Sequence, residues 1–134
     1  MSDFVVDTHV VIWYLSKNKR LSRKAQTIFQ KAAAGHSHVV IPSIVLVETI
    51  FLVQRERLNE EVVKTLLALT ENPNDGIYVY PLNKAVVQAL SHFGPVAIPE
   101  LADRIIAATA IHLDLPLLTI DPSIQASKLV KTVW

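Results

Sequence analysis

The amino-acid sequence predicts an α/β domain of three layers, in which a short central parallel sheet of four to five strands is flanked by helices. Stretches of four or five apolar residues alternate with longer stretches of helical character, which is typical of a parallel sheet covered on both faces. The expected strands are almost continuously apolar, as buried parallel strands are. The chain has 134 residues, 51% of them hydrophobic, which suits one folded core and excludes intrinsic disorder. With no internal repeat or linker, residues 1–134 are expected to form a single domain.

The first half of the chain is expected to contain two strands and three helices. The first apolar strand is followed directly by a segment whose apolar spacing suits a helix. Ser22 can cap the second helix, which Gly35 stops. Pro42 and Ser43 open the third helix, because proline is tolerated in a first helical turn. These elements are expected at residues 4–7, 8–15, 22–34, 39–41 and 43–57.

The second half adds three helices and two or three strands. Asn59 and Asn83 are plausible helix N-caps, and residues 72–76 form a dense turn signal. Gly94 and the proline after it break one helix, and Pro99 starts the next. The last strand is an edge candidate. These elements are expected at residues 59–71, 77–80, 83–93, 99–113, 116–120 and 130–133.

Composition excludes several classes of protein. The chain has no cysteine, so it has no disulfide framework, thiolate zinc site or cysteine nucleophile. No apolar run approaches the roughly 18 residues of a membrane span, and the start lacks the basic region of a secretory signal. A soluble cytoplasmic protein without a membrane partner is therefore expected. The net charge of +1 argues against polybasic binding but permits a local basic patch.

Four of the twelve acidic residues stand against apolar sequence. Asp7 and Asp121 end the first and fourth expected strands. Glu48 has apolar helical neighbours, and Asp103 lies early in a helix whose following residues are nearly all apolar. Each has an ordinary structural explanation: Asp7 as an N-cap, Glu48 at the margin of a buried face, Asp103 as a dipole partner, and Asp121 in an Asp-Pro turn. The other eight acids fit ordinary surface positions, although Glu100 is either a first-turn stabiliser, which we favour, or an auxiliary site carboxylate.

The combination is more informative than its parts, because the carboxyl ends of parallel strands lie at one edge of a sheet. Four carboxylates gathered there would repel one another and raise each other's pKa unless cations neutralise them. A cluster of oxygen ligands suits Mg²⁺ or Mn²⁺ rather than zinc. Thr8 and Thr119 could orient neighbouring carboxylates, and His9 could lie near them, although threonine is also a good strand residue and histidine is more often packed.

The sequence resembles a PIN-domain ribonuclease, and within that family the VapC-type toxins of toxin–antitoxin pairs. Four motifs in register, spanning nearly the whole chain, carry the resemblance. Many relatives have Asp-Pro shortly before the third acid, whereas this chain has Glu100 and Leu101, which puts the role of Glu100 in doubt. The motifs are residues 5–15, 42–50, 102–110 and 117–121.

The resemblance implies a PIN-like fold and metal-dependent hydrolysis of RNA that leaves 5′-phosphate and 3′-hydroxyl ends. Asp7, Glu48, Asp103 and Asp121 would be its acidic quartet, with Thr119 as supporting hydroxyl. Asp7 and Asp103 would be the primary ligands of Mg²⁺ or Mn²⁺, and the other two would complete a second site or hold outer-shell waters. The resemblance also implies a cognate antitoxin that inhibits the enzyme, and a homodimer.

An RNA substrate requires positive charge. Five bases fall within eight residues, and they form either a phosphate-binding rim or a solvated helix entrance. Arg104 is likewise either a phosphate contact or a solvated neighbour. The five bases are Lys17, Lys19, Arg20, Arg23 and Lys24.

Two other functions are considered. A haloacid-dehalogenase-like phosphatase also ends its first strand in aspartate, but it needs a second aspartate where this chain has His9. A non-catalytic interaction module with the same fold would carry the quartet without using it.

Overall fold

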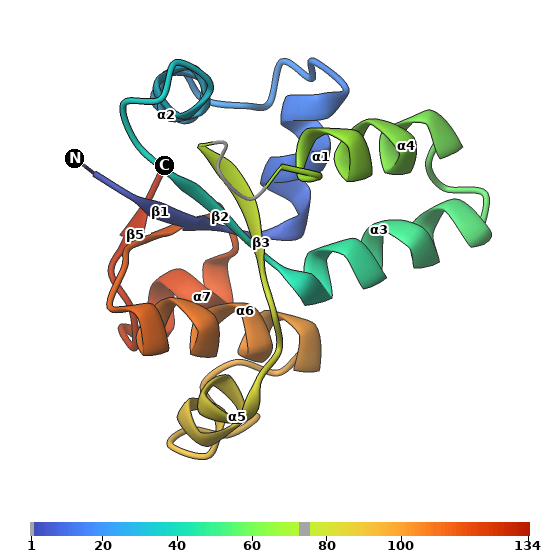
Figure 1. Ribbon diagram of the computed structural model, residues 1–134. Helices are drawn as coiled ribbons and strands as arrows, with labels where there is room; N and C mark the ends of the chain where they lie inside the picture. Colours follow the sequence, from blue (N-terminus) through green and yellow to red (C-terminus); the bar gives the residue numbers. More distant parts are fainter. Residues whose placement is uncertain (1, 73–75) are drawn as a thin grey trace.

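The computed structural model describes residues 2–72 and 76–134, in which seven helices and five strands alternate (Figure 1). All neighbouring strands pair in parallel, in the order β3-β2-β1-β4-β5. The expected parallel sheet of four to five strands is therefore confirmed. The strands are β1 Phe4–Val6, β2 Val39–Pro42, β3 Ile77–Tyr80, β4 Leu117–Leu118 and β5 Thr132–Val133.

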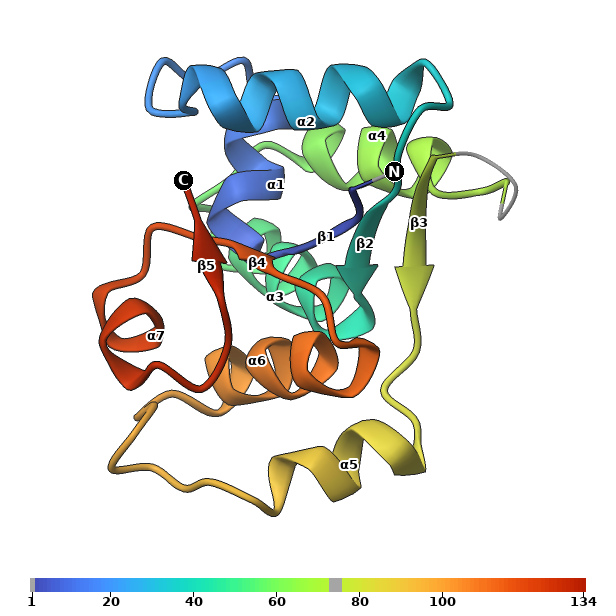
Figure 2. The same cartoon turned by 90° about the vertical axis from the view of Figure 1, so that its left-hand side faces the viewer.

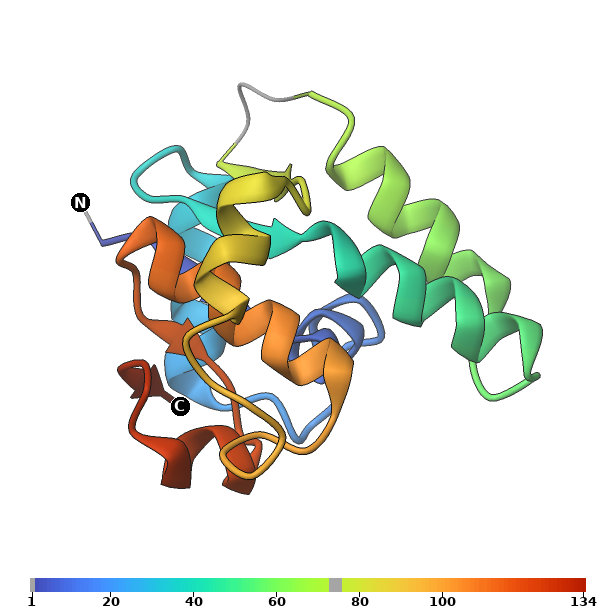
Figure 3. The same cartoon turned by 90° about the horizontal axis from the view of Figure 1, so that it is seen from below.

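Helices cover both faces of the sheet, giving the three expected layers. Figures 1 and 2 show α1 and α2 on one side of the sheet and α6 on the other, while Figure 3 shows α5 crossing the outer side of α6. The helix α3 leaves the carboxyl end of β2 and packs against α1, α4 and α6. The helices are α1 Thr8–Leu15, α2 Arg23–Ala33, α3 Ser43–Gln54, α4 Glu60–Leu69, α5 Lys84–Leu90, α6 Leu101–Leu113 and α7 Pro122–Ser127.

Three helix starts expected from capping residues are confirmed. The side chains of Ser22, Asn59 and Asn83 each accept a hydrogen bond from a backbone N–H in the first turn of α2, α4 and α5. Such a bond satisfies one of the N–H groups that a helix start leaves without a partner. The cap and its partner are only two or three positions apart, so the sequence alone is enough to predict the helix start.

Several element boundaries were predicted wrongly. The helix α6 begins at Leu101 rather than Pro99, because Glu100 has extended backbone angles and occupies the N-cap. Expected helices ending near Arg57, Glu71 and Phe93 stop at Gln54, Leu69 and Leu90. Glu56 has a φ of 59°, a left-handed conformation that cannot continue a right-handed helix. The turn expected at residues 72–76 falls mainly on 73–75, including Asp75, outside the described residues.

The helix α7 was missed, because Asp121 and Pro122 were interpreted as a turn. Asp121 is the N-cap of α7, its carboxylate accepts from the backbone N–H of Ile124 at 3.0 Å, and Pro122 stands in the first helical turn. This is a strong sequence signature for a helix start. The expected strand 116–120 is correspondingly shortened to Leu117–Leu118.

The core lies on both faces of the sheet, against α1 and α2 on one side and α6 on the other. Residues 105–110 of α6 are all buried, which confirms the expectation of a buried helix. Ala107 and Ala110 are fully inaccessible and pack in the same cluster as Val5, Val6 and Leu118. Small alanine side chains let the helix backbone approach the sheet closely. Among the described residues, no helix is long and apolar enough to cross a membrane.

Candidate active site

The order of the strands creates a switch point between β1 and β4. From β1 the chain adds β2 and β3 on one side, and β4 and β5 on the other. Ligand sites in open parallel sheets form outside the carboxyl ends of the strands at such a point. Asp7 directly follows β1 and Thr119 directly follows β4, so the fold places both at this position.

Asp7 is both a helix cap and a buried carboxylate. Its Oδ1 accepts from the backbone N–H of Val10 at 3.1 Å, and its Oδ2 accepts from the hydroxyl of Thr119. The residue is only 5% exposed. Burial raises its pKa above the ordinary value of 3.8, and this effect outweighs the two hydrogen bonds and the nearby His9, which lower it. Capping and a role in a site are therefore compatible in one residue.

Thr119 connects Asp7 to Asp121. The backbone N–H of Asp121 donates to the Thr119 hydroxyl at 3.0 Å, and that hydroxyl in turn donates to Asp7. Thr119 is fully buried, so this relay is shielded from water. The Thr119 hydroxyl is thus bonded directly to the Asp7 carboxylate, and one carboxylate oxygen of Asp121 caps α7.

Glu48 lies on α3 at the margin between buried and exposed surface. Its neighbours in sequence are Val47, 58% exposed, and Thr49, fully buried. Its Oε1 accepts a hydrogen bond from the hydroxyl of Thr8, the first residue of α1. Glu48 is therefore half-buried and partnered, and the bond ties α3 to the helix that Asp7 caps.

Asp103 is a second carboxylate of the group with a raised pKa. Its pKa is raised from 3.8 to about 7, mainly by burial and then by the negative charges of Asp121, Glu100, Glu48 and Asp7, in that order. Each of these causes raises the pKa. The mutual raising expected for gathered carboxylates is seen at this residue.

The donor set fits a hard divalent cation. It consists of carboxylate oxygens and threonine hydroxyls, with negative charge in excess. Within residues 2–72 and 76–134, however, no group of three or more acidic or histidine side chains is drawn together closely enough to hold an ion in the arrangement seen.

Glu100 and His9 both lie at exposed positions near the acidic residues. Glu100 is exposed and makes no side-chain capping bond, and its charge contributes to the raised pKa of Asp103. Both roles considered for Glu100, first-turn stabiliser and auxiliary site carboxylate, therefore stay predictions. His9 is exposed on α1, with its ring 6.2 Å from that of Trp13, and its charge acts on Asp7.

The basic residues lie apart from the acids. The five clustered bases are all exposed, in the segment between α1 and the first turn of α2. Asp7 is at the opposite end of α1, whose eight residues span about 12 Å. Arg104 is half-buried, and its Nε is buried without a hydrogen-bond partner in the described part of the chain.

Comparison with known proteins places the chain in a family. No curated protein matches it. Among solved structures it is similar to VapBC2 from Rickettsia felis bound to promoter DNA, with 14% identity, a TM-score of 0.73, and coverage of 98% of this chain and 97% of that one. It is also similar to FitAcB from Neisseria gonorrhoeae (21%, TM-score 0.64, coverage 98% and 96%) and to a toxin–antitoxin complex from Klebsiella pneumoniae (17%, TM-score 0.65, coverage 98% and 96%).

These likenesses establish the fold, and the family follows from a match over most of the chain. Residues 4–127 match the PIN domain, a stretch that contains the whole acidic quartet and Thr119. The chain belongs to the PIN domain family.

Proposed function

We propose that this protein is a metal-dependent endoribonuclease of the VapC type, the toxin of a type II toxin–antitoxin pair. The observation that carries the proposal is the gathering of carboxylates around Asp103 at the switch point of the sheet, where their charges and burial raise its pKa. Family membership supports nuclease chemistry. The similar structures, described as VapBC or as a toxin–antitoxin complex, support the toxin role.

In this proposal Asp7 and Asp103 hold Mg²⁺ or Mn²⁺. Glu48 and Asp121 complete a second site or orient water. Such an ion, when bound, polarises the phosphoryl group and lowers the pKa of the attacking water. Water adds to phosphorus, the bond to the 3′ oxygen breaks, and the products are a 5′-phosphate and a 3′-hydroxyl.

The chain's own residues prepare the site. Thr119 fixes Asp7 by donating to its Oδ2, and Thr8 fixes Glu48 in the same way. These hydroxyls set the direction of each carboxylate before any ligand arrives, which reduces the reorganisation needed for binding.

The RNA partner would be bound by positive charge outside the acidic group. Arg104, one residue from Asp103, is a candidate phosphate contact because its buried Nε lacks a partner in the described residues. The exposed bases Lys17, Lys19, Arg20 and Arg23 would bind the strand further away. An RNA substrate also makes the cytoplasm the proposed place of action.

We further propose a cognate antitoxin and a homodimer. Three large apolar side chains of α3 are exposed close together in sequence: Val47 at 58%, Ile50 at 39% and Phe51 at 51%. Grouped exposed apolar residues are typical of surfaces that another protein covers, which supports self-association through α3.

The proposal is tested by incubating the purified protein with a structured RNA pool in Mn²⁺, in Mg²⁺ and in chelator. We expect cleavage only with metal, and its loss in Asp7→Asn and in Asp103→Asn. Asp114→Asn is the matched control, because Asp114 is exposed at the end of α6 with a φ of 54°, a conformation that asparagine tolerates.

Either quartet variant cutting as well as the wild type would refute the site assignment. If no RNA is cut under any condition while neutralising the quartet only raises stability, the non-catalytic interaction module is the better description. Mapping the end groups of the products checks the direction of bond cleavage.

A further inference from the structure

One side of α1 carries a series of aromatic rings that begins beside the proposed catalytic centre. His9 is the second residue of α1, and Asp7 is the N-cap of the same helix. The charge of His9 acts to lower the pKa of Asp7, so the two side chains are close. Trp13 stands four positions after His9, on the same face of the helix, and the centroids of their rings are 6.2 Å apart. The rings therefore start at the acidic group and continue outward along α1.

Trp13 is held in place by two neighbours. Trp134 directly follows β5, and its ring meets that of Trp13 edge-on with 5.9 Å between centroids. The guanidinium of Arg20 lies over the Trp13 ring, 5.8 Å from its centre, a favourable cation–π contact. Both indoles are half-buried and pack against the core. We refer to His9, Trp13 and Trp134 as the ring cluster.

The ring cluster lies at the edge of the sheet that carries the acidic group. The strands β1, β4 and β5 are parallel, so their carboxyl ends share one edge. Asp7 follows the first of these strands and Trp134 follows the last. The fold therefore brings the ring cluster and the acidic group together from both ends of the described chain.

His9 is the member of the ring cluster that is open to solvent. A flat ligand held between two rings needs them parallel and about 7 Å apart, twice the carbon–carbon contact distance of about 3.5 Å. The rings of His9 and Trp13 are closer than this and are inclined at 57°, so a flat ligand cannot lie between them. The outer face of the imidazole is where such a ligand can stack.

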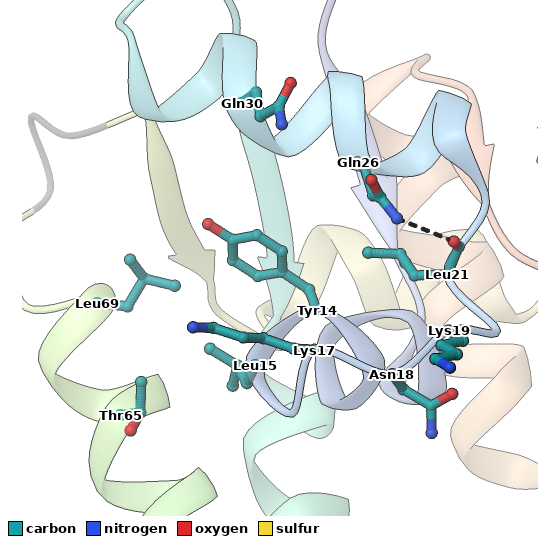
Figure 4. Close-up of a pocket in the computed structure, with 10 residues that line it drawn as sticks. All are labelled: Tyr14, Leu15, Lys17, Asn18, Lys19, Leu21, Gln26, Gln30, Thr65 and Leu69. Atoms are coloured by element: carbon teal, nitrogen blue, oxygen red, sulfur yellow. Dashed lines mark hydrogen bonds between the residues drawn. The ribbon is translucent and has the colours of Figure 1, made fainter.

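Tyr14, the residue after Trp13, belongs to a different surface. Its ring stacks on Phe29 of α2 with centroids 4.0 Å apart. Figure 4 shows Tyr14 in the wall of a cavity between α1, α2 and α4, with Leu69 alongside. No member of the ring cluster lines that cavity. The ring cluster is therefore a separate feature, on the side of α1 that faces β5.

The chemistry next to His9 identifies the flat ligand. Proteins that bind single-stranded RNA stack unpaired bases on aromatic side chains, histidine included, and neighbouring cations attract the backbone. Here the open ring adjoins a carboxylate of the proposed catalytic centre, and Arg20 supplies positive charge beside the ring cluster. A base of the strand that is cut is the planar group that must lie near this position.

We infer that His9 stacks on the nucleobase next to the phosphate that is cut, with Trp13 as the ring that positions the imidazole. The inference rests on the proposed nuclease function and deepens it, because it makes His9 a residue that positions the substrate and selects the base beside the cut. Stacking requires no proton on the imidazole. Purines, with their larger rings, cover more of it than pyrimidines and are the preferred bases.

Binding of RNA to the full chain tests the inference without depending on activity. Chelator is present throughout, so metal-dependent cleavage is prevented. The probes are a labelled oligoadenylate and an abasic strand of equal length, which has the same backbone charge but no bases. We expect the wild type to bind oligoadenylate about tenfold more tightly than the abasic strand, as is usual for one stacked base. His9→Ala should lose this preference.

Three further variants separate stacking from other causes. His9→Phe keeps a stacking ring without a charge and should retain the preference, whereas His9→Gln keeps polarity without an aromatic ring and should lose it. His36→Ala is the matched control, because His36 is an exposed histidine near the amino end of β2, at the opposite edge of the sheet. It should behave as the wild type. Circular dichroism checks that each variant is folded.

Two other measurements locate the contact. Trp13 and Trp134 are the only tryptophans of the chain, so the intrinsic emission reports on the ring cluster. This emission should change when oligoadenylate binds to the wild type, and change less in His9→Ala. In the cleavage assay with Mn²⁺, His9→Ala should raise KM about tenfold, change kcat less, and weaken the preference for a purine beside the cut.

Several results would overturn the inference. A preference for oligoadenylate that survives in His9→Ala would do so, and so would its loss in His9→Phe, which would assign the contact to charge. RNA binding that leaves the tryptophan emission unchanged would place the strand elsewhere. If no strand binds while His9→Ala alters self-association in sedimentation, the ring belongs to a protein interface.

Failure of the inference and failure of the nuclease proposal are distinguishable. RNA cleavage that is unaffected by His9→Ala leaves the nuclease proposal intact and removes the stacking contact. Stacking of oligoadenylate on His9 in a protein that cuts no RNA under any condition removes the nuclease proposal and leaves an RNA-binding surface.

Discussion

At the scale of single residues, the hydroxyl of Thr119 links the ends of β1 and β4. Thr119 accepts from the backbone of Asp121 and donates to Asp7, although Asp7 and Thr119 are 112 positions apart in sequence. The Asp7 carboxylate is thereby oriented through both oxygens, because the backbone N–H of Val10 donates to its Oδ1 and Thr119 donates to its Oδ2.

Replacing Thr119 tests how much this link stabilises the fold. Thr119→Val removes the hydroxyl with little change of shape and leaves Asp7 without that donor in a site where it is 5% exposed. We expect a loss of about 1–3 kcal/mol in the free energy of unfolding, measured by urea denaturation in chelator. Thr119→Ser, which keeps the hydroxyl, should retain most of the stability. Equal stability of the valine variant and the wild type would show that the link is dispensable.

The raised pKa of Asp103 predicts the pH dependence of the metal-free protein. The carboxyl has a pKa of about 7 in the folded state and an ordinary value of 3.8. Between these values the folded state binds more protons than the unfolded state, so the free energy of unfolding falls as pH rises from about 4 to about 7. The raised pKa of Asp7 acts in the same direction.

Asp103→Asn should flatten this decline, because it removes the titrating group and its repulsion. Asp114→Asn, the exposed control, should keep it. Denaturation curves in chelator at several pH values across the window measure both slopes. A wild-type stability that rises through the window would contradict the prediction.

At the scale of elements, three helices begin at the acidic group. Asp7 caps α1, Asp121 caps α7 and Asp103 lies in the first turn of α6. Helix starts present free N–H groups and a partial positive charge, which stabilise carboxylates there. These residues therefore stabilise helix starts and also belong to the proposed catalytic site. Only a substitution that keeps one of the two roles can separate them.

Asp121 permits that separation. Asparagine caps helices about as well as aspartate, whereas alanine costs about 1 kcal/mol. We expect Asp121→Asn to keep the unfolding free energy of the wild type and Asp121→Ala to lose about 1 kcal/mol, while both lose metal-dependent RNA cleavage. Urea denaturation and the cleavage assay on the same preparations check this. Full cleavage by the asparagine variant would restrict Asp121 to capping.

For the whole molecule, the sheet order places several carboxylates near one another, and their negative charges raise the pKa of Asp103. A ligand that binds only the folded state stabilises it by mass action. At neutral pH, Mn²⁺ or Mg²⁺ should therefore raise the Tm of the wild type. At an ion concentration of a hundred times the Kd, the free energy of unfolding should increase by about 2.7 kcal/mol. Thermal unfolding of wild type, Asp7→Asn and Asp114→Asn checks this, with the first and third expected to respond and the second not. An equal response of all three would place the ion elsewhere.

Self-association is the second prediction for the whole molecule. Phe51 is 51% exposed on α3, with the guanidinium of Arg55 4.7 Å from its ring centre. If α3 forms the homodimer interface, Phe51→Glu should yield a monomer by sedimentation, because a carboxylate would be buried without a partner. Leu129→Glu, at an exposed apolar residue elsewhere, should leave the association unchanged. A wild type that sediments as a monomer at all concentrations would rule out the homodimer.

Local chemistry explains what could be predicted from the sequence. Capping by Ser22, Asn59 and Asn83 depends on bonds over two or three residues, so it is visible in the chain itself. The same local reasoning failed for the ends of α3, α4 and α5, which depend on where backbone angles change. It also missed α7, although Asp121 followed by proline carried the signal.

By itself the sequence determined the parallel α/β class and the three helix starts with capping residues. It also determined that the four residues of the acidic quartet stand at strand ends and on helices. Apolar periodicity and composition decide these features without knowledge of distant contacts. Only the tertiary structure decided which residues meet. Thr8 bonds Glu48 across 40 positions and Thr119 bonds Asp7 across 112, and Asp103 acquires its raised pKa from burial and from four other carboxylates. The order of the strands controls these contacts, because it brings the ends of β1 and β4 together, and desolvation and charge repulsion exist only once they are assembled.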